Sequence, residues 1–167
     1  MIAPFQALSA QHFDLLRPAT ADEIIAFAGT LLEQRLQRGP VLGGAEQVQA
    51  FLRTRLGGAA RELFGVLFVD SRHQYLGFEI LFMGSLRGSE VHPREVVRRA
   101  LALNAAAVIL VHNHPSGHLE PSPEDILLTR RIDDALALLD MRVLDHLIVS
   151  ASDWVSLSAR GWRFSDD

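Results

Sequence analysis

A short apolar run that ends in two histidines constrains this chain more than any other feature. Residues 105–111 read AAAVILV, and an apolar stretch rich in β-branched side chains is typical of a buried strand. His112 and His114 follow directly, and alternate residues of a strand point to the same side. We therefore expect both imidazoles to project together from the C-terminal edge of a sheet, where α/β proteins usually bind ligands.

The residues after the histidines predict a turn and then a helix. Pro115 cannot continue a hydrogen-bonded ladder, and the Ser-Gly dipeptide after it favours a turn. Ser122 precedes Pro123, which is the arrangement of a helix N-cap followed by the first helical position. Asp125 would then lie in the first turn, where its carboxylate can reach back toward the end of the strand.

The residues alone leave two interpretations of this segment open. His112, His114 and Asp125 can supply three metal ligands and leave a fourth position open, as in catalytic zinc sites. Ser122 and Asp125 also come close to a capping box, which needs no metal, and a lone histidine is more often a core or surface residue than a ligand. A His-x-His pair, a polar loop and an acid on the next helix rarely coincide, so we favour the metal site.

Residues 112–125, HNHPSGHLEPSPED, resemble the JAMM motif of the JAB/MPN metalloenzymes, and the branch they resemble is RadC. The motif is His-x-His-Pro, six residues, then Ser-x-x-Asp, and the chain matches every fixed position. Residues 91–97, 104–110 and 142–149 extend the resemblance, which covers about residues 60–162. It implies a mixed α/β (α+β) fold, with a central mixed sheet flanked by helices in the cytidine-deaminase-like three-layer architecture of JAB/MPN domains.

The resemblance also implies a zinc-dependent hydrolase that holds one Zn²⁺ per chain. His112, His114 and Asp125 would be the ligands, with a water in the fourth position. Ser122 would help to stabilise the oxyanion of a tetrahedral intermediate, and a glutamate on an earlier element would act as general base. Glu62 is the best candidate for this base, because the Glu-x-x-Gly-x-Leu around it is similar to the family's pattern.

The other glutamates and histidines near these segments are expected to have other roles. Glu79, on the following strand, is the alternative general base, whereas Glu95 fits the first turn of a helix. His146 is expected to be a structural histidine, hydrogen-bonded near the site, rather than a ligand or a catalytic group. His118 lies in the turn between the two halves of the motif, where it could contact substrate, although a solvated loop histidine explains it more simply. His92 marks the start of a helix.

Composition excludes several classes of function. The chain has 167 residues, enough for one domain with a core, and 49% of them are hydrophobic, so disorder is not expected. It has no cysteine, which excludes disulfides, a cysteine nucleophile, thiolate metal sites and the zinc deaminases. No apolar run reaches membrane-spanning length and no signal-peptide pattern is present, so we expect a cytoplasmic protein with no membrane partner.

The charge balance argues against general affinity for nucleic acid. The formal net charge is −4, and all 16 basic residues are arginine, so Schiff-base lysine chemistry and a P-loop are excluded. A local DNA-binding patch remains open at Arg94, Arg98, Arg99 and the Arg130-Arg131 pair, although solvated helix faces explain these residues as well.

The chain divides into an N-terminal helical segment over residues 1–58, packed on the domain, and a RadC-like JAB/MPN domain over 59–167. Longer RadC proteins carry a helix-hairpin-helix region associated with DNA, and the first segment here lacks its glycine-hairpin pattern. A capping box at Thr20 and Glu23 begins a helix that is expected to end at Gly39-Pro40. The other predicted elements are helices over 46–56, 93–103 and 123–139, and strands over 62–69, 74–82 and 143–150.

Three functions from different classes remain. The favoured one is a zinc metallohydrolase, a metallopeptidase or isopeptidase that cleaves a peptide, isopeptide or related amide bond. The second is a DNA-associated repair accessory protein, as the RadC resemblance suggests. The third is a non-catalytic MPN scaffold that docks a partner, which the complete ligand set argues against. A homo-oligomer is compatible with all three.

Overall fold

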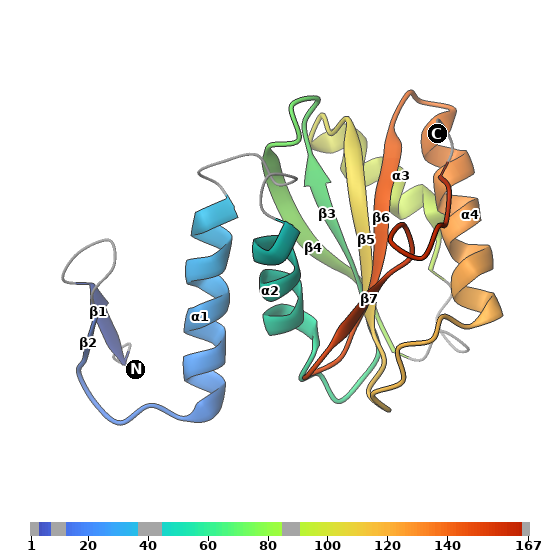
Figure 1. Cartoon of the computed structure of the whole chain (residues 1–167). Helices are drawn as coiled ribbons and strands as arrows, with labels where there is room; N and C mark the ends of the chain where they lie inside the picture. Colours follow the sequence, from blue (N-terminus) through green and yellow to red (C-terminus); the bar gives the residue numbers. More distant parts are fainter. Residues whose placement is uncertain (1–3, 8–12, 37–44, 85–90, 165–167) are drawn as a thin grey trace.

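The computed structural model describes residues 4–7, 13–36, 45–84 and 91–164, and its centre is a mixed sheet of five strands (Figure 1). The strand order is β4-β3-β5-β6-β7. β5 and β6 run parallel, and the other three neighbouring pairs are antiparallel. The strands are β3 (Leu63–Val69), β4 (Tyr75–Met83), β5 (Ala107–Asn113), β6 (Arg142–Val149) and β7 (Trp154–Ser156).

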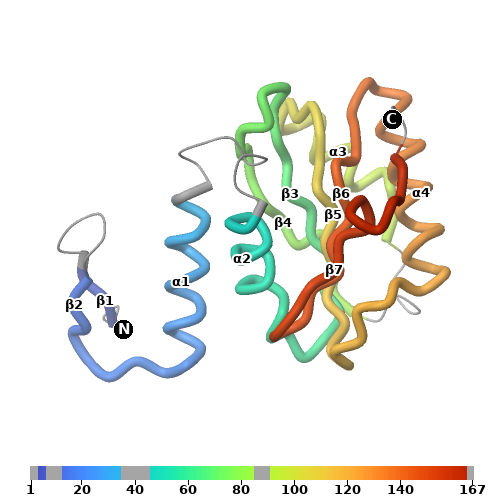
Figure 2. Tube along the Cα trace, viewed as in Figure 1, coloured from blue at the N-terminus to red at the C-terminus, as the bar shows by residue number. Residues whose placement is uncertain are grey.

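Helices cover both faces of this sheet and produce three layers (Figure 2). α2 (Ala45–Leu56) packs on one face, and α3 (Pro93–Ala102) and α4 (Pro123–Ala137) pack on the other. α1 (Ala21–Leu36) lies against α2 on the side away from the sheet. The expected mixed sheet in a three-layer architecture is therefore confirmed.

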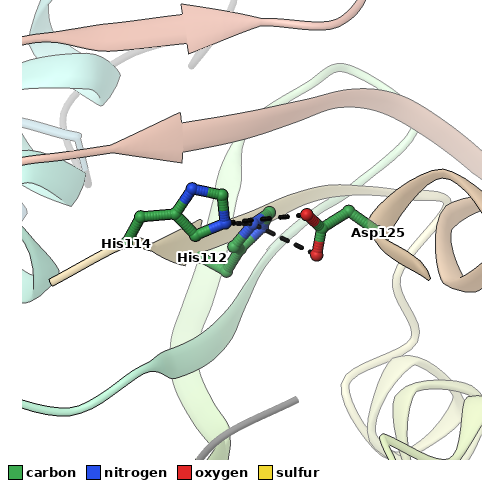
Figure 3. A group of neighbouring side chains, drawn as sticks. All are labelled: His112, His114 and Asp125. Carbon is green, nitrogen blue, oxygen red and sulfur yellow. Dashed lines mark hydrogen bonds and ion pairs between the residues drawn. The ribbon is translucent and has the colours of Figure 1, made fainter. Parts of the chain in front are cut away.

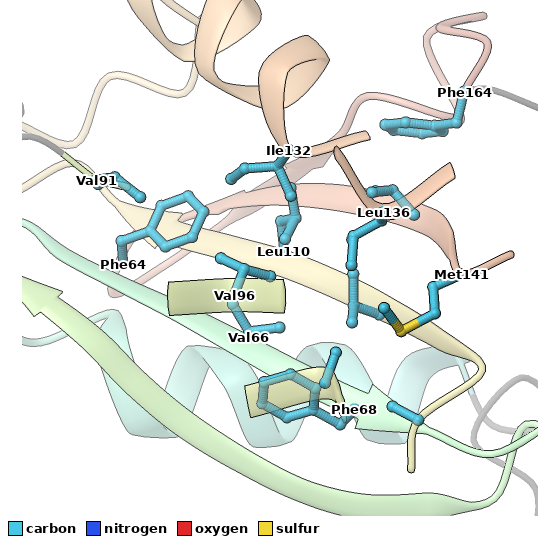
Figure 4. Packing of buried hydrophobic residues seen from close by; sticks show 14 of the residues in the cluster. Phe64, Val66, Phe68, Val91, Val96, Leu110, Ile132, Leu136, Met141 and Phe164 are labelled. Carbon is cyan, nitrogen blue, oxygen red and sulfur yellow. The ribbon is translucent and has the colours of Figure 1, made fainter. Parts of the chain in front are cut away.

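Alternate side chains of β3 pack into two different hydrophobic cores, one on each face of the sheet. Phe64, Val66 and Phe68 pack with residues of α3 and α4, as Figure 4 shows, whereas Leu67 and Val69 pack with α2. β5 is buried at every position because it lies in the middle of the sheet with helices on both faces. This explains its nearly continuous apolar sequence, and it carries the polar residues at its end into the protein interior.

Most of the predicted elements are confirmed, and their observed ends differ from the predicted ones by at most two residues. The capping box at the start of α1 is also confirmed. Glu23 N donates to Thr20 Oγ1 at 3.2 Å, and Thr20 N donates to Glu23 Oε2 at 2.9 Å. The predicted end of this helix at Gly39-Pro40 lies outside the described residues, and the division of the chain at residue 58 stays a prediction.

Three short strands were not predicted. β1 (Phe5–Ala7) pairs antiparallel with β2 (Phe13–Leu15) in a region without sequence periodicity, and β7 pairs with the end of β6. Each has three residues, too few for an alternating pattern to show. The β1–β2 pair depends on contacts with a later part of the chain, since Phe5 of β1 and Phe13 of β2 both pack on Phe27 of α1.

Among the described helices, none combines the length and the apolar character that a bilayer span requires.

Candidate metal centre

β5 and α4 bring together the three residues that the sequence suggested as ligands (Figure 3). His112 lies near the end of β5, His114 directly follows the strand, and Asp125 lies in the first turn of α4. The Nε2 atoms of the two histidines are 2.9 Å apart. Asp125 Oδ1 is 3.4 Å from His112 Nε2, and Asp125 Oδ2 is 3.6 Å from His114 Nε2. One ligand atom from each residue lies within 4.8 Å of the others, so the group could hold a metal ion.

Asp125 provides a structural test of whether a metal fits. The residue is buried, and its Oδ1 atom has no hydrogen-bond partner in the described part of the chain. An unsatisfied buried acceptor costs free energy and calls for an explanation, such as an ion. Two imidazole nitrogens and a carboxylate oxygen are suitable ligands for zinc and related divalent metals. The residues present therefore fit a metal ion.

The capping and metal interpretations of this segment are compatible. Ser122 is the N-cap of α4, and its Oγ accepts a hydrogen bond of 3.1 Å from Asp125 N. In return, Asp125 Oδ2 accepts bonds of 2.8 Å and 2.7 Å from the backbone N–H and the hydroxyl of Ser122. Oδ2 thus completes the capping box, while Oδ1, which takes no part in it, lies 3.4 Å from His112 Nε2. The same carboxylate can serve the helix and the metal.

We expect Ser122→Ala to lower the free energy of unfolding by about 1 kcal/mol, because the substitution removes the N-cap acceptor. Urea denaturation measures this difference. Ser116→Ala is the matched control, since Ser116 is exposed in the preceding loop, and its effect should stay within about 0.5 kcal/mol. Equal stability of the two variants would show that the Ser122 hydroxyl does not stabilise α4.

The charges in the cluster depend on one another. Burial by itself would raise the pKa of Asp125, but the imidazoles of His112 and His114, which lie 3.4 Å and 3.6 Å from its oxygens, outweigh burial and hold this pKa far below its ordinary value. The neighbouring carboxylate of Asp125 raises the pKa of His114, and the carbonyl of His118 and the charge of Glu62 add to the increase. A proton and a metal ion therefore compete for the space between these side chains.

A fully buried histidine lies behind His112. His146 Nε2 is 2.8 Å from His112 Nδ1, and His146 Nδ1 is 2.6 Å from the hydroxyl of Thr129 on α4. Burial and the neighbouring His112 lower the pKa of His146 well below its ordinary value, so this imidazole is neutral. The expectation of a hydrogen-bonded structural histidine near the site is confirmed. Its bond to Thr129 was not predicted.

Two further histidines behave as the sequence indicated. His118 has an exposed side chain, and its backbone carbonyl accepts a bond of 2.6 Å from His114 Nδ1. His92 is the N-cap residue of α3, and its side chain makes no capping bond. The loop around His118 thus orients His114 through the backbone alone.

The structure separates the candidate general bases. Glu62 directly precedes β3, which pairs with β5 so that Phe64 lies opposite His112. Glu62 and His112 line the same narrow cavity. Glu79 lies on β4, one strand farther from β5, and forms an ion pair with Arg99 that lowers the pKa of Glu79. Of these two glutamates, Glu62 is the one beside the cluster.

Asn113, between the two histidines, ties the segment around Glu62 to β5. Its side chain is fully buried, and its Oδ1 accepts a bond of 2.7 Å from Leu63 N. Its Nδ2 donates to Arg61 O at 3.1 Å and to Ala59 O at 3.3 Å. Asn113 was not predicted to have a role, although an amide at the end of a buried strand is a signal that its hydrogen bonds are made elsewhere in the fold.

The arginines that suggested a DNA-binding patch have protein partners. Arg94 and Arg98 lie 3.6 Å and 3.0 Å from carboxylate oxygens of Glu95, in the first turn of α3 as expected. On α4, the guanidinium of Arg130 lies over the Trp162 ring, 5.0 Å from its centre. These contacts favour the interpretation as solvated helix faces.

Comparisons with known proteins agree with the geometry. A family model described as RadC-like JAB domain matches residues 42–162. The chain is 51% identical over 131 residues to a UPF0758 protein of Azotobacter vinelandii, which covers 78% of this chain and 58% of the relative. It is 46% identical over 154 residues to a UPF0758 protein of Ectopseudomonas mendocina, which covers 91% of this chain and 69% of the relative. The chain thus spans 58% of the length of the first of these relatives.

Proposed function

The chain belongs to the RadC-like JAB domain family, and from this premise we propose that it is a zinc-dependent metallohydrolase of the JAMM type. Its substrate would contain a peptide, isopeptide or related amide bond. One observation carries the proposal. His112, His114 and Asp125 converge in a buried cluster in which a carboxylate oxygen has no hydrogen-bond partner among the described residues.

His112, His114 and Asp125 would hold one Zn²⁺ per chain. When bound, zinc supplies Lewis-acid chemistry, which activates a water molecule and polarises the scissile carbonyl. Two imidazoles and one carboxylate leave a position open for exchange, as catalytic zinc sites do and structural zinc sites do not. The cysteine-free sequence is consistent with this ligand set.

Glu62 would act as the general base. Its carboxylate would take a proton from the attacking water and deliver a proton to the leaving nitrogen. Two observations support this role. The charge of Glu62 is close enough to the cluster to contribute to the raised pKa of His114, and the bonds of Asn113 hold the backbone on both sides of Glu62.

Ser122 would support the developing oxyanion. In the present arrangement its hydroxyl donates to Asp125 Oδ2, so the hydroxyl must rotate before it can donate to a substrate oxygen. The backbone N–H of Ser122 would continue to hold Oδ2 after this rotation, because it donates to the same atom. Asp125 would therefore stay oriented while Ser122 changes its partner.

Elemental analysis of the protein purified without added metal tests the proposal. We expect about one zinc per chain, as a single three-ligand site implies, and its loss in His114→Ala. His92→Ala is the matched control, because His92 lies at the start of α3 and should leave the zinc content unchanged. If the wild-type protein holds no zinc even after zinc is offered and the excess removed, the hydrolase proposal is wrong.

A further inference from the structure

A line of hydrogen bonds connects the backbone of α4 to His112. Thr129 Oγ1 lies 2.6 Å from Asp125 O and 2.6 Å from His146 Nδ1. On the other side of the same ring, His146 Nε2 lies 2.8 Å from His112 Nδ1. All four residues are at most 1% exposed, so water does not compete for these bonds.

The carbonyl at one end sets the direction of the whole line. A carbonyl oxygen only accepts, so the Thr129 hydroxyl must give its single proton to Asp125 O. Thr129 Oγ1 then acts as acceptor toward His146, and His146 Nδ1 must carry a proton. A fully buried imidazole whose ring nitrogens face a hydroxyl and another imidazole is neutral, because a buried charge needs a charged partner. His146 Nε2 is therefore an acceptor.

The bond between His146 and His112 extends this line of hydrogen bonds into the cluster. Because His146 Nε2 accepts, the proton of this bond belongs to His112 Nδ1. A neutral His112 with its proton on Nδ1 carries a lone pair on Nε2, the atom that faces His114 and Asp125. We propose that Thr129 and His146 are positioning residues that hold His112 in the tautomer able to bind the metal through Nε2. The inference rests on the proposed function only for the identity of that metal.

His114 receives equivalent support by a shorter route. Its Nδ1 lies 2.6 Å from the carbonyl of His118, so this nitrogen must also donate. The Nδ1 proton of each ligand candidate is thus held by a different acceptor. A loop carbonyl accepts it from His114, and the buried His146, itself bonded to Thr129, accepts it from His112. Groups that hold a ligand histidine in this way affect metal affinity without contacting the metal.

Two substitutions of Thr129 separate the hydroxyl from the volume of the side chain. Thr129→Val keeps the shape but removes the acceptor for His146 Nδ1–H. We expect the proton of His146 to move to Nε2 and that of His112 to move to its own Nε2, where it blocks the metal. Thr129→Ser keeps the hydroxyl and is the conservative control. Competition of Zn²⁺ with a chromophoric chelator should show an affinity loss of about 10- to 100-fold in the valine variant and rescue in the serine variant.

Nitrogen-15 NMR of the histidine side chains reads the tautomers directly. In the metal-free wild-type protein at mildly alkaline pH, His112 should carry its proton on Nδ1, and in Thr129→Val on Nε2. A loss of packing alone would not move this proton. The proposal is overturned if wild-type His112 carries its proton on Nε2, or if the folded valine variant binds zinc as tightly as the wild type. Because the wild-type tautomer is measured without metal, this result is independent of whether zinc is the native ion and of whether the valine variant folds.

Discussion

Glu62→Gln will bind zinc as the wild-type protein does and will lose between about 10²- and 10⁴-fold of its turnover, which is the usual contribution of a general base. Glutamine has nearly the shape of glutamate but cannot accept the proton of the attacking water. Glu62 directly precedes β3 and is not among the ligand candidates, so the metal site should stay intact. Zinc content and the hydrolysis of a quenched fluorescent peptide library are the two measurements.

The matched control is Glu79→Gln. Glu79 is also a partly exposed glutamate of the β3–β4 hairpin, but it pairs with Arg99 and lies one strand farther from β5. Its substitution should leave turnover unchanged. If Glu62→Gln retains full activity, the base lies elsewhere. If it loses zinc together with activity, Glu62 supports the metal site and its role in proton transfer is not established.

Asn113→Asp will lower the free energy of unfolding by about 3 kcal/mol or more, because it places an unpaired charge in the protein interior. The buried amide of Asn113 now donates to the carbonyls of Ala59 and Arg61. A carboxylate would instead place an acceptor oxygen opposite these two carbonyl oxygens, which also only accept. Only the bond from Leu63 N would remain. Guanidinium denaturation measures the change.

Asn104→Asp is the matched control for this substitution. Asn104 is exposed and has a positive φ of 53°, a conformation that aspartate also tolerates. Its effect should stay within about 0.5 kcal/mol, as for most exposed sites. Similar effects of the two substitutions would show that the three bonds of Asn113 do not stabilise the fold. The two predictions are linked, because the segment that Asn113 holds contains Glu62.

Patterns that act over a few residues predicted much of the candidate site. The two-residue period of a strand predicted that His112 and His114 lie side by side at the end of β5, and the N-cap pattern placed Asp125 in the first turn of α4. In each case the covalent chain itself sets the geometry.

Other parts of the site depend on residues that are far apart in the chain. The sequence left Glu62 and Glu79 as alternatives, and the pairing of β3 with β5 and of Glu79 with Arg99 separated them. His146 and His112 are 34 residues apart, and their bond requires β6 to lie parallel to β5 in one register. No local pattern determines such a register, because packing of the whole sheet against its helices selects it.

The sequence by itself thus determined the type of fold, the ligand candidates and the helix cap that carries one of them. The tertiary structure alone decided which glutamate lies at the cluster, how Asn113 holds the backbone beside that glutamate, and how Thr129 and His146 are hydrogen-bonded to His112. The physical reason is the distance along the chain over which each kind of interaction acts. Periodicity and capping operate within a few bonded residues, whereas strand register and buried hydrogen bonds form only when distant segments pack together.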